Sequence, residues 1–121
     1  MVLILGGYGA GKKRYARSLG YTDADMGEDA HADCPVLVGL ESLVRSDPEH
    51  ADALLPLLLK KELVLCCEVG SGVVPFDRKD RVYREATGRL TCALAERATA
   101  VVRVVAGIPV ALKGELPCRC D

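Results

Sequence analysis

Short apolar runs recur along the 121-residue chain, and polar segments rich in glycine, proline and charged residues separate them. The runs are nearly continuous rather than alternating, which is typical of strands buried on both faces of a parallel sheet. This pattern predicts four buried strands, at residues 2–5, 35–40, 63–67 and 100–105. A further apolar segment, residues 108–113, follows too closely for a crossover connection, so we expect it to pair antiparallel.

Helical patterns lie between these strands. The first predicted helix covers about residues 11–19. The second spans residues 47–61, with Asp47 as its N-cap, Pro48 at its first position and a kink at Pro56. The third runs from about residue 77 to 98 and carries one apolar stripe, formed by Val82, Ala86, Leu90 and Leu94.

Strands that alternate with helices indicate parallel strands joined by right-handed crossovers. We therefore expect an α/β three-layer sandwich with a mostly parallel sheet of about five strands. Residues 21–33 contain five carboxylates and show little periodicity, so they are predicted to form a solvated loop. One domain at residues 1–113 and a tail at 114–121 account for the whole chain.

Composition narrows the class of protein. No apolar run approaches the roughly 18–20 residues that span a bilayer, and no signal-type segment opens the chain, so we expect a cytoplasmic protein without a membrane partner. The formal net charge of −1 gives no indication of a nucleic-acid partner.

Six cysteines suggest buried thiols in a reducing compartment rather than a disulfide framework. Cys66 and Cys67 lie inside an apolar run, and Cys92 lies in a helical pattern. Cys118 and Cys120 form a C-x-C pair without a nearby histidine, which favours two free thiols in a frayed tail over a metal or redox site.

The stretch GGYGAGKKR follows the first predicted strand and opens the first helix. Its spacing fits the phosphate-binding motif G-x-x-x-x-G-K-[ST] up to Lys12, but Lys13 stands where the motif has a hydroxyl. That hydroxyl is a Mg²⁺ ligand in P-loop enzymes, so phosphate binding is expected while Mg²⁺ remains open and no metal ligand is certain. The alternative is a tight turn with a solvated basic face. The candidate phosphate-binding residues are Gly6, Gly7, Gly9, Gly11, Lys12, Lys13 and Arg14.

A second candidate loop follows the strand at 63–67. Glu68 lies just past the strand end, and the turn after it contains Gly70, Ser71 and Gly72. Ligands of open parallel sheets bind outside the carboxyl ends of the strands, where both loops emerge. Arg78 begins a basic set on the following helix that either faces an anionic ligand or is solvated.

The string EVGSGVVPFDRKDRVYREATGRL and the later VVAGIPVALK resemble the C-terminal half of the bifunctional adenosylcobinamide kinase and adenosylcobinamide-phosphate guanylyltransferase of cobalamin biosynthesis. GGYGAGKKRYA is similar to the P-loop start of that family. The resemblance implies a P-loop NTPase-like fold, often a homo-oligomer assembled as a trimer. It also implies phosphorylation of adenosylcobinamide with GTP or ATP, followed by GMP transfer through a histidine-linked intermediate.

By position, this resemblance places the triphosphate on residues 6–12, and Glu68 with the turn at 70–72 on the active-site rim. Three departures accompany it. Lys13 replaces the hydroxyl, and Gly39 stands where the family has an acidic residue, with Glu41 two residues later on the predicted strand as a substitute. The family segment that carries the guanylylated histidine is shortened, and its single histidine here is His31.

Two hypotheses follow. The first is a compact cobinamide kinase that has lost guanylyl transfer, with Lys12 neutralising phosphate charge and Glu68 or Glu41 as the metal or base candidate. The second is a non-catalytic module that binds a nucleotide or a corrinoid. A third use of the loop, binding only inorganic anions or a protein, also stays open.

Overall fold

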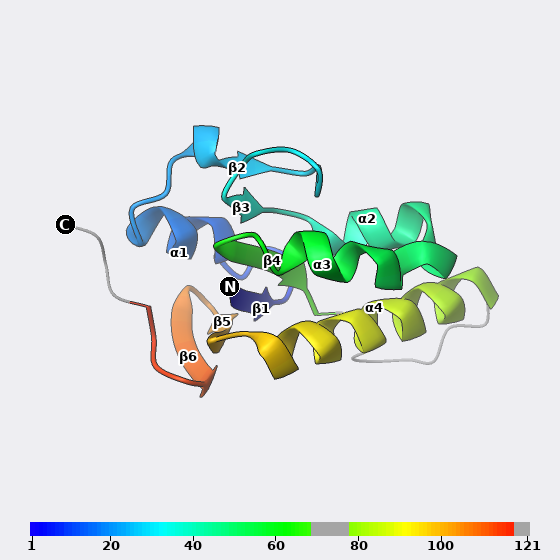
Figure 1. The fold of residues 1–121 in the computed structure, drawn as a ribbon. Helices are drawn as coiled ribbons and strands as arrows, with labels where there is room; N and C mark the ends of the chain where they lie inside the picture. The colour runs from blue at the N-terminus through cyan, green and yellow to red at the C-terminus, as the bar shows by residue number, and fades with distance from the viewer. Residues whose placement is uncertain (69–77, 118–121) are drawn as a thin grey trace.

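The computed structural model describes residues 1–68 and 78–117 and shows a six-stranded sheet in the order β2-β3-β4-β1-β5-β6 (Figure 1). All neighbouring strands are parallel except β5 and β6, which are antiparallel as predicted. The strands are β1 (Val2–Gly6), β2 (Met26–Gly27), β3 (Val36–Leu37), β4 (Leu63–Cys67), β5 (Ala100–Val105) and β6 (Ile108–Lys113).

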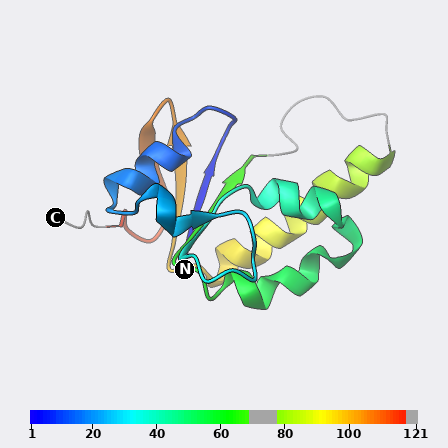
Figure 2. The same cartoon turned by 90° about the horizontal axis from the view of Figure 1, so that it is seen from above.

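Helices cover both faces of this sheet. The helix α1 packs on one face, and α2, α3 and α4 pack on the other, as the view from above makes clear (Figure 2). This is the predicted α/β three-layer sandwich. The helices are α1 (Lys12–Ser18), α2 (Leu40–Ser46), α3 (Leu55–Leu58) and α4 (Arg78–Arg97), with 3₁₀ helices η1 (Asp23–Asp25) and η2 (Pro48–Leu54).

The apolar core divides at the sheet, because successive side chains of a strand point to opposite faces. In β1, Leu3 joins the cluster under α2, α3 and α4, whereas Ile4 joins the cluster under α1. Both side chains are fully buried. This two-sided burial explains why the strands appear in the sequence as continuous apolar runs.

The central strand β1 positions the candidate site. Its last residue, Gly6, is paired with Cys67 at the end of β4 and with Val104 near the end of β5. The loops that follow β1 and β4 therefore leave the sheet at the same edge, as the sequence predicted. A Cβ on Gly6 would lie 2.9 Å from the carbonyl oxygen of Val104, so only glycine fits there.

The prediction of a strand over residues 35–40 was wrong at its C-terminal end. The strand β3 has only two residues, and Gly39 adopts a left-handed conformation with φ of 75° as the N-cap of α2. Glycine adopts this conformation without steric cost, so it ends the strand and starts a helix that the sequence analysis missed. Glu41 consequently lies in the first turn of α2 and not on a strand face.

The second predicted helix, residues 47–61, was also wrong as a single helix. The chain instead forms η2 and then α3, and Pro56 lies in the first turn of α3 rather than at a kink. Proline lacks an N–H and clashes with the preceding turn, so it is tolerated only where a helix begins. Asp47 gives no capping bond, because its carboxylate contacts Nδ1 of His50 at 2.9 Å.

The segment 21–33 is more ordered than the predicted loop. It contains η1 and the short strand β2, which pairs parallel with β3 and raises the sheet to six strands. The side chain of Asp25 accepts a hydrogen bond from the backbone N–H of Thr22 at 2.8 Å, forming a capping box. The Thr-x-x-Asp spacing in the sequence is typical of such a capping box.

The long helix α4 agrees with the prediction apart from its buried stripe. Ala86, Leu90 and Leu94 are buried as expected, but Val82 is 37% exposed and Tyr83 is buried in its place. Cys92, expected to be buried, is exposed, whereas Cys66 is buried and Cys67 is half-buried. Within residues 1–68 and 78–117, no helix is both long and apolar enough to cross a membrane.

Candidate functional site

The glycine loop, defined here as residues 6–12, connects β1 directly to α1. Gly9 and Gly11 have φ angles of 74° and 98°, which side chains with a Cβ rarely adopt. The N–H of Ala10 donates to the carbonyl of Gly7 at 3.1 Å. From the β5–β6 turn, the N–H of Gly107 donates to the carbonyl of Ala10 at 2.8 Å. The loop is thus fixed both from within and from the neighbouring hairpin.

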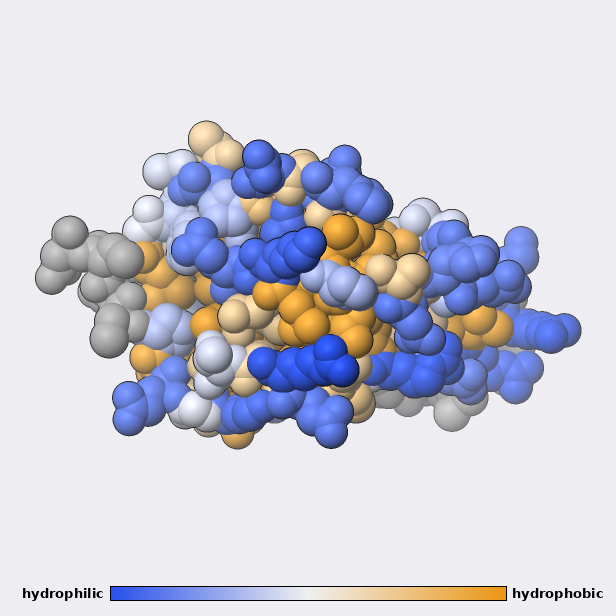
Figure 3. All heavy atoms as spheres, viewed as in Figure 1, coloured by the Kyte–Doolittle hydropathy of each residue, from blue (hydrophilic) through white to orange (hydrophobic). Residues whose placement is uncertain are grey.

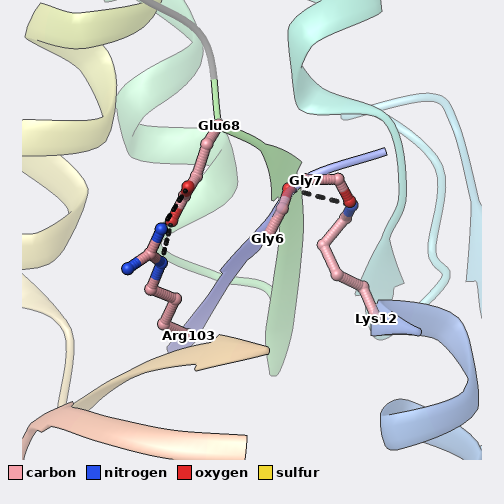
Figure 4. A network of polar contacts seen from close by, with 5 residues as sticks. All are labelled: Gly6, Gly7, Lys12, Glu68 and Arg103. Carbon is pink, nitrogen blue, oxygen red and sulfur yellow. Dashed lines mark hydrogen bonds and ion pairs between the residues drawn. The ribbon is translucent and has the colours of Figure 1, made fainter. Parts of the chain in front are cut away.

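Lys12 turns back over this loop. Its Nζ donates to the carbonyl oxygens of Gly6 and Gly7 at 3.1 and 3.0 Å (Figure 4). It also donates to Sγ of Cys67 at 3.3 Å. The first two contacts close the loop around the ammonium, and the third ties it to the end of β4. The lysine of the motif is therefore placed in the loop, where it can meet a bound phosphate.

A cleft of about 500 Å³ opens beside the loop. Lys13 and Arg14 line it, and their side chains form no hydrogen bond or ion pair with any other residue that the structure describes. Arg17 also lines it, but its Nε is paired with Asp23 at 2.8 Å. Lys13 and Arg14 thus lie beside Lys12 without a partner among the described residues. The lining residues are Tyr8, Gly9, Ala10, Gly11, Lys12, Lys13, Arg14, Arg17, Glu28, Val38, Gly39, Glu41, Ser42, Leu65 and Cys67.

Glu41 brings a carboxylate to the same cleft from the first turn of α2. Its Oε2 accepts a hydrogen bond from the backbone N–H of Cys67 at 3.1 Å, which fixes the side chain against the end of β4. Cys67 therefore contacts Lys12 through its sulfur and Glu41 through its N–H. These two contacts hold a cation and a carboxylate on either side of one residue.

Glu68 is turned away from this cleft. Its carboxylate pairs with Arg103 of β5, with Oε1 at 2.7 Å from Nε and Oε2 at 3.1 Å from Nη2. Figure 4 shows this pair and Lys12 on opposite sides of the end of β1. Arg103 was not predicted as a site residue, although it is a lone arginine within the apolar run AVVRVV.

Two thiols beside the site are kept protonated. Burial raises the pKa of Cys67; the hydrogen bond from Lys12 lowers it, and the one involving Glu41 raises it. Burial also raises the pKa of the Cys66 thiol well above its usual range. The sulfur of Cys67 is therefore a neutral acceptor for the Lys12 ammonium and not a competing anion.

Comparison with known proteins identifies the family of the chain. Residues 43–112, more than half of the chain, match the model of the CobU family, described as cobinamide kinase / cobinamide phosphate guanyltransferase. The chain belongs to this family. A curated relative is the bifunctional adenosylcobalamin biosynthesis protein CobP of Pseudomonas aeruginosa, 34% identical over 101 residues. That match covers 78% of this chain and 58% of the relative, so the chain spans less than two thirds of its relative's length.

The family match starts at Leu43, after the glycine loop and Glu41, and it includes Glu68 and Arg103. The mostly parallel sheet and its flanking helices are consistent with a P-loop NTPase-like CobU domain. Assignment of the loop at 6–12 therefore rests on its motif and its geometry.

The cleft departs from the usual magnesium site of a P-loop at position 13. Magnesium takes oxygen ligands, and the lysine's neighbour in the P-loop normally supplies a hydroxyl. Lys13 occupies that position, and the described residues contain no group of three or more His, Cys, Asp or Glu side chains arranged to hold a metal ion. Lys13 thus replaces the usual magnesium ligand of the P-loop, and the carboxylates of the described residues that line the cleft are Glu28 and Glu41.

His31 lies away from the glycine loop. It lines a separate hollow together with Lys60, Lys61 and Glu62, which immediately precede β4, whereas the loop follows the opposite end of β1. Its segment is held there by Lys61, whose Nζ donates to the carbonyls of Ala32 and Cys34. The structure therefore does not bring His31 to the cleft beside the glycine loop.

The remaining predicted site residues divide into two groups. Gly70, Ser71 and Gly72 lie outside the described residues, as do Cys118 and Cys120. Arg78 is the exposed first residue of α4 and does not line the cleft.

Proposed function

We propose that this chain binds the triphosphate of GTP or ATP on the glycine loop and transfers the terminal phosphoryl group to adenosylcobinamide. The observation that carries the proposal is the position of Lys12, held by the carbonyls of Gly6 and Gly7 beside a cleft that Lys13, Arg14 and Arg17 also line. Membership of the cobinamide kinase family supports the choice of acceptor.

The step needs little covalent chemistry from the protein. The hydroxyl oxygen of the aminopropanol end of cobinamide attacks the terminal phosphorus, and the bond from that phosphorus to its bridging oxygen breaks. The nucleoside diphosphate leaves, and Glu41 takes the hydroxyl proton. Lys12, Lys13 and Arg14 offset the charge on the phosphate oxygens, which is the main requirement of such a transfer.

Removal of Mg²⁺ probes the role of these cations. We expect the affinity for GTP or ATP to fall by less than about tenfold when EDTA removes the metal, because lysine supplies charge where the P-loop hydroxyl is absent. Calorimetric titration with and without Mg²⁺ measures this. A loss of binding in EDTA would contradict the assignment of Lys13.

Guanylyl transfer through His31 is left out of the proposal. The histidine lines a different hollow from that of the glycine loop, and the family's histidine segment is shortened here. We also propose that the chain assembles as a homo-oligomer, a trimer by family resemblance, which sedimentation velocity tests.

A non-catalytic module for a nucleotide or corrinoid is the second candidate. The replacement of a metal ligand by Lys13 and the pairing of Glu68 with Arg103 favour it, because both remove groups that a magnesium-dependent kinase would use. Such a module would bind GTP or ATP through Lys12 without forming a product.

An assay of phosphoryl transfer separates the two candidates. Folded protein is incubated with adenosylcobinamide and γ-labelled GTP or ATP, and labelled cobinamide phosphate is measured. The kinase proposal expects product from the parent and from Lys60→Ala, an exposed lysine outside the phosphate cleft, but none from Lys12→Ala. Nucleotide binding without product would reject the kinase and support the non-catalytic module.

A further inference from the structure

A second hollow adjoins the cleft beside the glycine loop. It has a volume of about 380 Å³ and lies between α1 and β2. Several residues line both hollows, so the two are continuous. The shared residues are Lys13, Arg17, Glu28 and Val38, and the rest of the lining is Asp23, Met26 and Gly27. This hollow therefore opens onto the phosphate site of the proposed function.

Hydrogen bonds hold the walls of the hollow. The carbonyl of Gly27, the last residue of β2, accepts a hydrogen bond from the N–H of Val38 at 2.8 Å, which fixes the point where Glu28 begins. On the side of α1, Nε of Arg17 is paired with Oδ1 of Asp23 at 2.8 Å. Hydrophilic residues make up most of the surface over η1 and β2, as Figure 3 shows in the view of Figure 1. The hollow is thus a fixed and polar extension of the cleft.

The free charges of the hollow have opposite signs. Lys13 and Glu28 form no hydrogen bond or ion pair with any other residue in the described part of the chain, while Arg17 and Asp23 neutralise each other. An anion in the hollow would meet the Glu28 carboxylate, and a cation would meet the Lys13 ammonium, so neither is favoured. A neutral group with both a hydrogen-bond donor and an acceptor can use both side chains. An amide next to a hydroxyl is such a group.

We propose that this hollow holds the aminopropanol arm of the acceptor, and that the Glu28 carboxylate accepts a hydrogen bond from the amide N–H of the arm. The inference rests on the proposed function and names the residue that selects the acceptor. A volume of about 380 Å³ is near the lower limit of small-molecule sites, so it suits the arm, while the corrin ring stays outside.

Lys13 links the arm to the reaction. It lines both hollows, so its ammonium lies between the arm and the phosphates on the glycine loop. An arm held by Glu28 brings its hydroxyl to the terminal phosphorus in a fixed orientation, which lowers the entropy cost of the transfer. Glu28 is thus a residue for binding and specificity, whereas Glu41 takes the proton.

Steady-state kinetics of phosphoryl transfer test this site. Glu28→Ala should raise the KM for adenosylcobinamide by at least about tenfold, because the arm loses a hydrogen bond to a charged group. The KM for GTP and kcat should change by no more than about threefold, since this contact is made equally before and during the transfer. Glu28→Gln keeps an acceptor oxygen and should recover part of the loss. Glu49→Ala is the matched control, because Glu49 is an exposed carboxylate that lines neither hollow, and it should match the parent.

A pair of corrinoids gives a second test that needs no turnover. Calorimetry compares adenosylcobinamide with the same corrinoid that carries a free carboxylate in place of the aminopropanol amide. The parent should bind adenosylcobinamide at least about tenfold more tightly, because the free carboxylate would face Glu28. Glu28→Ala should lose this preference.

The outcomes separate this site from the proposed function. Turnover with an unchanged KM for adenosylcobinamide in Glu28→Ala would overturn the arm site and leave the kinase standing. A fall in kcat of about a hundredfold at constant KM would also overturn it, because Glu28 would then be the proton acceptor. Equal affinity of the parent for the two corrinoids would overturn it too. A parent that binds nucleotide but neither corrinoid would reject the acceptor of the proposed function as well.

Discussion

Two carboxylates lie at the C-terminal end of β4, and the structure gives them different surroundings. Glu41, from α2, enters the cleft of the glycine loop and contacts the N–H of Cys67. Glu68, directly after β4, is paired with Arg103 across β1 and does not line that cleft. We call these the loop side and the ion-pair side of β1. The comparison shows that a position near the end of a strand does not decide the direction of a carboxylate side chain. The hydrogen-bond and ion-pair partners within reach decide it.

The largest expected contrast is in catalysis. Glu41→Gln should lower kcat by about a hundredfold or more, the usual contribution of a positioned proton acceptor, whereas Glu68→Gln should change it by no more than a few fold. Steady-state assays with adenosylcobinamide measure both, after circular dichroism shows both variants folded. If Glu68→Gln were the damaging change, the roles of the two sides would have to be exchanged.

Substitutions at the adjacent residues Gly6 and Gly7 test the described path of the glycine loop. Gly6→Ala should reduce the free energy of unfolding by about 1–3 kcal/mol, because its Cβ would meet the Val104 carbonyl at 2.9 Å within a packed sheet. At Gly7 a Cβ would meet nothing within 4 Å, so Gly7→Ala should stay within about 0.5 kcal/mol. Urea unfolding measures both, and equal effects would contradict the described path of the loop.

The ion pair itself should contribute little stability. The Arg103 and Glu68 side chains are 50% and 26% exposed, so solvent screens their attraction. A double-mutant cycle with Arg103→Ala and Glu68→Ala should give a coupling of about 1 kcal/mol or less. A coupling several times larger would assign the pair a structural role that its exposure does not explain.

The smallest effect concerns the Cys67 thiol. The hydrogen bond and charge of Glu41 raise its pKa, so Glu41→Gln should lower that pKa and speed alkylation by iodoacetamide at neutral pH. Glu68→Gln, the control, should leave the reaction unchanged. Peptide mass spectrometry across a pH series resolves Cys67 from the other cysteines. An equal shift in the two variants would place Glu68 beside the cleft as well.

Local features of the fold and site were predictable from sequence. The start of the first helix after the glycines and the antiparallel hairpin at β5 and β6 depend on a few consecutive residues, and the structure shows both. The end of β3 was predicted wrongly, because the left-handed Gly39 is a backbone choice that hydrophobicity does not report. Because of that error, Glu41 was predicted on a strand although it lies in the first turn of α2.

Contacts between residues far apart in the chain could not be predicted from the sequence either. Glu68 and Arg103 are 35 residues apart, and no residue near either of them specifies the pairing. A lone arginine in an apolar strand indicates only that an acceptor lies nearby in the fold. The hydrogen bond from the N–H of Gly107 to the carbonyl of Ala10 likewise joins the β5–β6 turn to the glycine loop near the other end of the chain. Such contacts are set by topology and are seen only in the folded chain.

The central claim is that Lys12 holds the phosphates of a nucleotide on the glycine loop. Calorimetric titration of GTP into the parent, Lys12→Ala and Lys60→Ala tests it most directly. We predict that Lys12→Ala loses at least about tenfold in affinity, since a hydrogen bond to a charged group contributes about 1.5–3 kcal/mol, while Lys60→Ala matches the parent. Equal affinity in the parent and Lys12→Ala would contradict the claim.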